Sequence, residues 1–115
     1  MRVECYEHGG FRVVTLTGDL DIESCTAVRS ALIDAIDERG RVIIDLTALD
    51  FMDSTGLGLL VSAHRRATER GGELRFVQPS TSVQRLFHMT GLDDVLAFHS
   101  SAQAAVDAAL LMDTP

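Results

Sequence analysis

The sequence predicts a single α/β domain with a mixed, mostly parallel sheet. Short runs rich in β-branched residues alternate with longer segments whose apolar residues recur at helical spacing. One short run, Val42–Leu46, is almost continuously apolar, which is typical of a strand covered on both faces. Strands that alternate with helices imply crossover connections and hence parallel pairing. We therefore expect about 4–5 strands and about 4 helices in one domain over residues 1–115.

The first two strands are expected to pair antiparallel at an edge of the sheet. Val3–Glu7 is a weak strand, and Phe11–Thr17 is a stronger one because β-branched side chains suit a pleated surface. Gly9 and Gly10 between them indicate a turn. Gly18 is expected to close the second strand.

An acidic loop and a long helix come next. The loop covers residues 19–22, and the helix covers Glu23–Arg39. Asp21 and Ser24 are both candidates for the N-cap, because their side chains can accept hydrogen bonds from free backbone N–H groups. Gly40 stands where a glycine commonly ends a helix. The apolar stripe of this helix consists of Cys25, Val28, Leu32, Ala35 and Ile36.

The second helix is expected after the central strand and a turn. Its apolar pattern begins at Leu57, and Ser54 stands at its expected start. Arginines in its last turns suit the negative end of the helix dipole, and Gly71 with Gly72 ends it. Its apolar face consists of Leu57, Leu60, Val61 and His64.

Two strands and two helices complete the predicted chain. Leu74–Val77 is a strand, and residues 80–82 supply caps for a helix that Gly91 ends. Val95–Phe98 is a short strand before the last helix. The apolar positions of these helices are Val83, Leu86, Phe87 and Thr90, and then Ala102, Ala105, Val106, Ala109 and Leu110.

Charge and composition exclude several classes of function. The chain has 10 Lys and Arg against 17 Asp and Glu, which gives a formal net charge of −7. Nucleic acids and anionic membrane surfaces are bound mostly by Lys and Arg, so we expect neither as a partner. The apolar runs are too short to span a bilayer, and residues 1–10 carry no apolar signal-peptide segment. We therefore expect a cytoplasmic protein.

The cysteines and histidines give no sign of a metal or a cofactor. Cys5 and Cys25 are far apart in the sequence, and the four histidines form no His-x-x-x-His pair. We interpret both cysteines as buried small hydrophobic residues in a reducing compartment. The sequence predicts no metal site and no cofactor.

Two loops at the carboxyl ends of strands carry the residues with functional character, because ligands of open α/β sheets gather beyond those ends. One loop holds Asp19 and Asp21, and the other holds Asp53 and Ser54. These four residues share one rim if their strands are neighbours. Carboxylates in such a cluster can hold Mg²⁺, but Asp19 and Asp21 are more typical of turn and capping residues.

Ser54 has two interpretations at the start of a helix. It is either a plain N-cap or a phosphorylation site, because exposed N–H groups and the helix dipole favour an anion there. Gly56 and Gly58 are unusual in a helix, where each costs about 0.5–1 kcal/mol relative to alanine. Gly58 and Ser62 would form a strip of small residues, either for packing against the protein's own sheet or for the approach of another backbone.

Catalytic motifs are incomplete. The segment 53–56 (DSTG) has one residue too many for the Asp-Thr/Ser-Gly motif of aspartic proteases. The segment 56–58 (GLG) lacks the third glycine of a dinucleotide fingerprint and the lysine of a P-loop. No Gly-x-Ser-x-Gly elbow is present, and His64 lies on the apolar helix face, where it is no obvious base for a serine. The sequence predicts that the protein is not an enzyme.

The segment 51–58 (FMDSTGLG) resembles the phosphorylation-site motif of bacterial anti-sigma factor antagonists, the STAS-domain family. Three further segments are similar to motifs of that family, in the same order along nearly the whole chain. They are 18–21 (GDLD), 42–46 (VIIDL) and the stretch from Pro79 and Val83 through 85–87 (RLF) to 91–92 (GL). The chain departs from the family at Asp19, where glutamate is common, and at Thr55, where serine is frequent.

The resemblance implies a STAS-type fold and a binding switch that is not an enzyme. Ser54 is the implied phospho-acceptor, and Asp21 and Asp53 fall at the acidic positions beside it. The unphosphorylated protein is expected to bind an anti-sigma factor that is also a serine kinase with a histidine-kinase-like ATPase fold, which frees the sigma factor. Phosphorylation by that kinase ends the complex, and a PP2C-type phosphatase restores the binder.

The implied partner-binding surface consists of Asp19, Asp21, Asp53, Ser54, Thr55, Gly56 and Gly58. Two other uses of the fold stay open as alternatives, namely a binding module in a stress-sensing complex or in lipid-transport machinery. A cytoplasmic domain of an anion transporter is disfavoured because the sequence shows no transmembrane segment. A serine hydrolase is the enzyme alternative, which the incomplete motifs disfavour.

Overall fold

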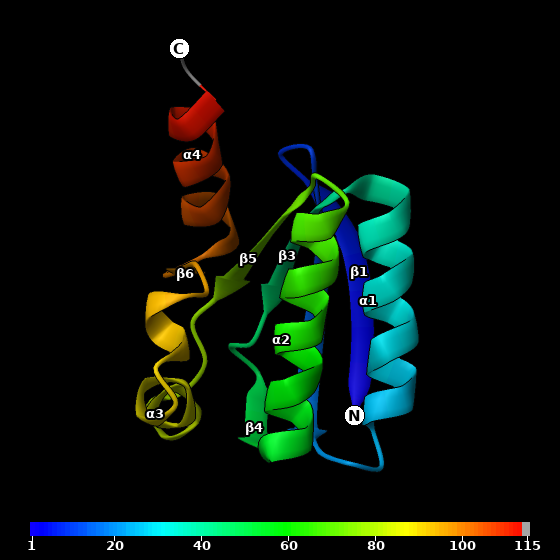
Figure 1. Cartoon of the computed structure of the whole chain (residues 1–115), viewed down its shortest axis with the longest axis vertical. Coiled ribbons are helices and arrows are strands. Elements are labelled where there is room, and N and C mark those ends of the chain that lie inside the picture. The colour runs from blue at the N-terminus through cyan, green and yellow to red at the C-terminus, as the bar shows by residue number, and fades with distance from the viewer. Residues whose placement is uncertain (114–115) are drawn as a thin grey trace.

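Six strands form one mixed sheet in the computed structural model, which describes residues 1–113 (Figure 1). The strands are β1 (Arg2–His8), β2 (Phe11–Leu20), β3 (Arg41–Asp45), β4 (Leu49–Met52), β5 (Glu73–Val77) and β6 (Phe98–His99). Their order is β1-β2-β3-β5-β6, and β4 pairs separately with β2. All pairs are parallel except β1 with β2. The predicted fold class is confirmed, with one strand more than the expected upper number.

Four α-helices accompany the sheet within the described residues, and they lie on both of its faces. They are α1 (Cys25–Arg39), α2 (Ser54–Glu69), α3 (Thr81–Met89) and α4 (Ala102–Asp113), with a short 3₁₀ helix at Leu92–Asp94. The apolar core on one face joins α1, α2 and α3 to the sheet, and a smaller core on the other face belongs to α4. In Figure 1, α1 and α2 lie side by side in front of the strands.

The alternation of side chains along each strand builds these two cores. Val14 and Ile44 belong to the core beneath α1 and α2, while their chain neighbours Val13 and Ile43 belong to the core beneath α4. Val42–Ile44 is therefore buried on both faces, as the continuous apolar run predicted.

The expectation that both cysteines are buried was wrong for Cys5, which lies exposed on the largely uncovered edge strand β1, whereas Cys25 is buried.

The antiparallel hairpin at the edge of the sheet is also confirmed. His8 pairs with Phe11 across the turn at Gly9 and Gly10. Both glycines have positive φ, 58° and 84°. A two-residue turn with positive φ at both positions matches the right-handed twist of the two strands. The glycines thus determine the register of the hairpin.

The second strand is longer than predicted. β2 does not end at Gly18 but continues to Leu20, with a register shift between Gly18 and Asp19. Beyond this irregularity, Asp19 pairs with Phe51 and Leu20 pairs with Met52 of β4. The prediction of a loop at Asp19 was therefore wrong. The backbone there pairs with β4, a strand that the local sequence does not reveal.

The last predicted strand is displaced along the chain. Val95–Phe98 was expected, whereas β6 covers Phe98–His99. The 3₁₀ helix at Leu92–Asp94 occupies the preceding segment, and Val95 follows it in a helical conformation. The β-branched Val95 is exposed there, so its β propensity is overridden by the path of the chain.

A buried arginine lies between β5 and α4. Arg75 is 7% exposed, and its guanidinium lies 3.2 Å from His99 Nε2, 3.3 Å from Met112 Sδ and 3.5 Å from a carboxylate oxygen of Glu73. Arginine can only donate, so the His99 ring accepts this hydrogen bond in its neutral form. Burial, with a smaller contribution from Arg75, lowers the pKa of His99 below its ordinary value of 6.5.

Protonation of His99 is therefore expected to destabilise the fold. Because folding lowers the pKa of His99, the unfolded chain takes up the proton first as the pH falls. The contribution of His99 to the free energy of unfolding is fully present above the ordinary pKa and is lost as the pH falls below it. Urea unfolding of wild type and His99→Gln at about pH 7.5 and about pH 5.5 tests this. Wild type should lose more stability than the variant, and equal losses would contradict the prediction.

Candidate functional site

The start of α2 is capped by Asp53. The backbone of Asp53 is extended, and its carboxylate accepts a hydrogen bond of 2.9 Å from the N–H of Gly56. Ser54 is the first residue of the helix. The interpretation of Ser54 as the N-cap was therefore wrong, because the preceding carboxylate already occupies that position.

Two backbone donors at this helix end are left without a partner. The N–H of Asp53 donates to the Leu20 carbonyl at 3.3 Å, and that of Gly56 donates to the Asp53 carboxylate. The N–H groups of Ser54 and Thr55 have no acceptor among residues 1–113. Both side chains are exposed. The helix thus begins with two free donors beside an accessible hydroxyl, an arrangement that suits an anion.

Gly56 allows α2 to approach the end of β2. A Cβ atom at this position would lie 2.6 Å from the Leu20 carbonyl oxygen and 2.8 Å from Leu20 Cγ. Gly56 therefore packs against the protein's own sheet and is buried. The structure places it beneath the surface that the sequence analysis assigned to a partner, where it positions Ser54.

Gly58 has a different environment. A Cβ atom there would meet no atom within 4 Å, and both Gly58 and Ser62 are exposed. The strip of small residues on α2 consequently does not pack against the sheet. Of the two interpretations of this strip, packing against the sheet is excluded, and Gly58 stays a candidate for the approach of another backbone.

Asp21 organises the loop between β2 and α1. Its carboxylate accepts hydrogen bonds of 3.1 Å from the N–H groups of Glu23 and Ser24. The hydroxyl of Ser24 makes no cap bond to the helix and instead donates to the Asp19 carbonyl at 2.9 Å. Of the two N-cap candidates, Ser24 takes the N-cap position of α1, without a side-chain bond to the helix, and Asp21 instead holds the turn that precedes it. The helix begins at Cys25, two residues later than expected.

The acidic residues predicted at one rim do come together. Burial raises the pKa of the Cys25 thiol, and the next largest cause is the negative charge of Asp53, with a further contribution from Asp21. Both carboxylates therefore lie near the start of α1. Asp19 and Asp21 also line an open depression of about 610 Å³ together with Asp50. This rim is at the lower end of the molecule in Figure 1, where α1 and α2 begin.

In residues 1–113, no three His, Cys, Asp or Glu side chains are placed to share a metal ion. No helix in the same part of the chain combines the length and apolar character needed to cross a membrane.

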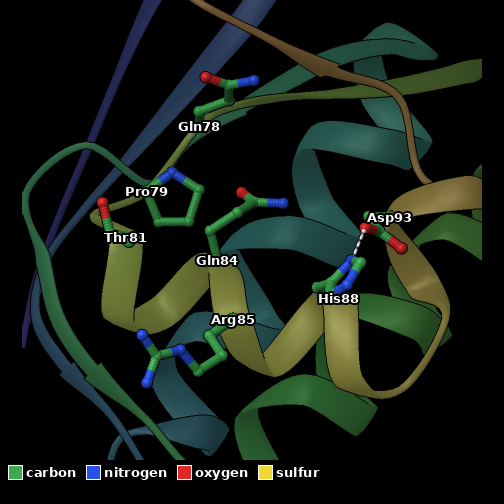
Figure 2. A pocket seen from close by; sticks show the side chains of 7 residues that line it. All are labelled: Gln78, Pro79, Thr81, Gln84, Arg85, His88 and Asp93. Carbon is green, nitrogen blue, oxygen red and sulfur yellow. Dashed lines mark hydrogen bonds and ion pairs between the residues drawn. The ribbon is translucent and has the colours of Figure 1, made fainter.

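A polar pocket of about 430 Å³ follows the carboxyl end of β5 (Figure 2). His88 and Asp93 form an ion pair of 2.7 Å at one side of it, and this contact raises the pKa of His88. In Figure 2 the guanidinium of Arg85 points away from this pair. The pocket is lined by Gln78, Pro79, Thr81, Gln84, Arg85, His88 and Asp93.

Sequence reasoning missed a second hollow, which lies between β4 and α3. Phe51 and Met89 line this groove and are both exposed. Met89 stands outside the apolar pattern of its helix, and Phe51 belongs to a strand that was not predicted. An apolar residue outside the core pattern was the available signal.

Comparison with known proteins agrees with the predicted family. The STAS domain family model matches residues 2–105. An anti-sigma F factor antagonist from Paenibacillus polymyxa is 30% identical over 103 residues, which cover 88% of each chain. An anti-sigma factor antagonist from Mycobacterium paratuberculosis has a solved structure with a TM-score of 0.84 at 25% identity, covering 93% of this chain and 92% of that one.

The fold is also that of SpoIIAA from Bacillus, an anti-sigma factor antagonist solved in two forms. Its unphosphorylated form has a TM-score of 0.79 and covers 98% of this chain and 100% of that one. Its phosphorylated form has a TM-score of 0.71, with 94% and 99% covered. Both are 23% identical to this chain, so the similarity supports the fold alone. On the family match and the 30% identity, the chain belongs to the STAS domain family, together with these anti-sigma factor antagonists.

Proposed function

We propose that the chain, as one STAS domain over residues 1–115, is an anti-sigma factor antagonist whose binding is switched off by phosphorylation of Ser54. One observation carries this proposal. Ser54 is exposed at the first position of α2, and its own N–H and that of Thr55 have no acceptor within residues 1–113. A hydroxyl with free helix donors beside it is accessible to a kinase and can retain the phosphate afterwards.

The proposed partners follow from the family. The unphosphorylated chain binds an anti-sigma factor that is also a serine kinase with a histidine-kinase-like ATPase fold. A PP2C-type phosphatase removes the phosphate. The chain itself has no catalytic activity in this scheme, and the circuit operates in the cytoplasm. Relatives named anti-sigma factor antagonists, and SpoIIAA solved in a phosphorylated form, support the scheme.

The phosphate acts locally in this proposal. It adds about −1.5 to −2 charges at pH 7, next to the carboxylates of Asp53 and Asp21. The free N–H groups of Ser54 and Thr55 offset part of this repulsion within the chain. A partner surface that closes over Ser54 has to accommodate a bulky dianion. A penalty of about 3–4 kcal/mol would weaken binding several-hundred-fold.

Substitution of Ser54 should separate binding from phosphorylation. Ser54→Ala should bind the kinase and resist phosphorylation, while Ser54→Asp should bind poorly. The measurement is a pull-down from the native cell with unphosphorylated protein, followed by addition of ATP. Wild type should release an ATPase-fold kinase, and Ser54→Ala should retain it. Thr55→Ala is the control for the neighbouring hydroxyl. Phosphorylation of Ser54→Ala at the wild-type rate would refute the assignment to Ser54.

Phosphorylation should leave the fold unchanged. The added charge meets exposed donors at the helix start and displaces no buried group. NMR spectra of the free chain with and without phosphate should therefore differ only for amides near the start of α2 and the β2–α1 loop. Changes spread over the strands of the sheet would show a conformational switch instead.

Gly56 and Gly58 should respond in opposite ways to the same substitution. Gly56→Ala forces a Cβ against the Leu20 carbonyl and should lower the free energy of unfolding by about 1–3 kcal/mol. Gly58→Ala meets no atom and should raise it by about 0.5–1 kcal/mol. Urea unfolding gives both values. If a partner backbone approaches Gly58, the more stable Gly58→Ala protein should nevertheless bind the kinase more weakly, and unchanged binding would remove Gly58 from the interface.

A further inference from the structure

The groove between β4 and α3 has the character of a binding surface. Its volume is about 270 Å³. Its lining includes Met52 and Val83, which are almost fully buried, and Phe51 and Met89, with 51% and 75% of their surfaces exposed. Two charged residues, Asp50 and Arg85, also line it. Single exposed apolar residues are common on protein surfaces. Two large ones from different elements that line the same hollow beside buried apolar residues indicate a contact site for another molecule.

This groove is continuous with the rim that carries Ser54. Phe51 stands in register with Asp19 on the neighbouring strand, and β4 leads through Asp53 directly into Ser54. Asp50 lines both the groove and the acidic depression at the start of α1. A partner that covers Ser54 therefore reaches an acidic hollow on one side and an apolar hollow on the other.

The two hollows differ in chemistry, and this difference indicates which side chains of a partner each one favours. The depression is lined by the carboxylates of Asp19, Asp21, Glu23 and Asp50. Among residues 1–113, no arginine or lysine lines it. Acidic groups there favour basic side chains and repel phosphate groups of lipids or nucleic acids. The groove favours an aliphatic or aromatic side chain, because such a group removes Phe51, Met89 and its own surface from water.

We propose that the anti-sigma factor bound at Ser54 also inserts an apolar side chain between Phe51 and Met89, while basic side chains of the same partner face the depression beyond Asp50. This inference rests on the proposed function and adds the second contact and its chemistry. Phe51 and Met89 are the apolar anchors of the interface, and Asp50 stands between its two halves.

The two halves should affect different rate constants. Exposed charges steer association, so the acidic half determines the association rate and its dependence on salt. The apolar half is formed after contact, so it determines how long the complex lasts. The dissociation rate should therefore depend on Phe51 and Met89 at every salt concentration.

The test uses the purified serine kinase that the unphosphorylated chain captures and that ATP releases. Association and dissociation rates are measured for Phe51→Ala and Met89→Ala at low and high salt. Each should raise the dissociation rate about tenfold and leave the salt dependence of association unchanged. The matched controls are Tyr6→Ala on β1 and Leu111→Ala on α4, whose side chains are 48% and 78% exposed. Both controls should keep the wild-type rates.

A pair of Asp→Asn variants tests the acidic half of the proposed interface. Asp50→Asn should slow association and weaken its salt dependence, whereas Asp34→Asn, at an exposed position on α1 without an ion pair in residues 1–113, should have a smaller effect. Thermal unfolding of every variant establishes that the fold is intact.

The outcomes separate this inference from the proposed function. If Ser54→Asp abolishes binding while Phe51→Ala and Met89→Ala bind as wild type does, the switch stands and the groove is not part of the interface. If the two alanine variants instead convert a dimer of the chain into a monomer, the groove joins two copies and the inference is wrong. If no ATP-released kinase is captured at all, the proposed function fails and the inference fails with it.

Discussion

The close approach of α2 to the end of β2 is the contact on which the functional end of this protein depends. Gly56 leaves room for the Leu20 carbonyl oxygen, and the N–H of Asp53 donates to the same carbonyl. The Asp53 carboxylate accepts a hydrogen bond from the N–H of Gly56. These contacts hold the first turn of the helix against the strand. Because the protein interior is close-packed, that turn cannot shift without disturbing its neighbours. The position of Ser54 and the direction of its free N–H group follow from them.

This arrangement fits the proposed switch, in which phosphorylation of Ser54 leaves the fold unchanged. The hydroxyl of Ser54, the proposed phosphorylation site, belongs to a helix start that is already held by its cap, and the N–H groups that the cap leaves free could meet a phosphate. Part of the net charge of −7 is concentrated on the same rim, at Asp19, Asp21 and Asp53. A phosphate adds to a surface that is already acidic, so its effect is expected at the interface with a partner rather than in the core.

Local sequence patterns are informative for those elements whose burial produces the pattern. Val42–Ile44 and the apolar stripe of α1 are buried as their periodicity predicts, because burial in the core is the origin of that periodicity. β4 was missed because only four residues form it and its two central ones are exposed. The extension of β2 to Leu20 was missed for the same reason, since its partner is β4. The groove between β4 and α3 left only a weak local signal, the apolar Met89 outside the core pattern of its helix, because its lining residues come from segments far apart in the chain.

The sequence by itself determined the α/β class, the hairpin at the edge, the family and the rim formed by Asp19, Asp21, Asp53 and Ser54. Each of these is encoded in the spacing of apolar residues, in glycines at a turn, or in short motifs whose residues are close together in the chain. Only the tertiary structure decided that Asp53, not Ser54, caps α2, that Gly56 is buried while Gly58 is exposed, and that an apolar groove adjoins the rim. These properties depend on contacts between residues far apart in the chain, such as that of Gly56 with the Leu20 carbonyl. The packing of β2, β4 and α2 against one another determines these contacts.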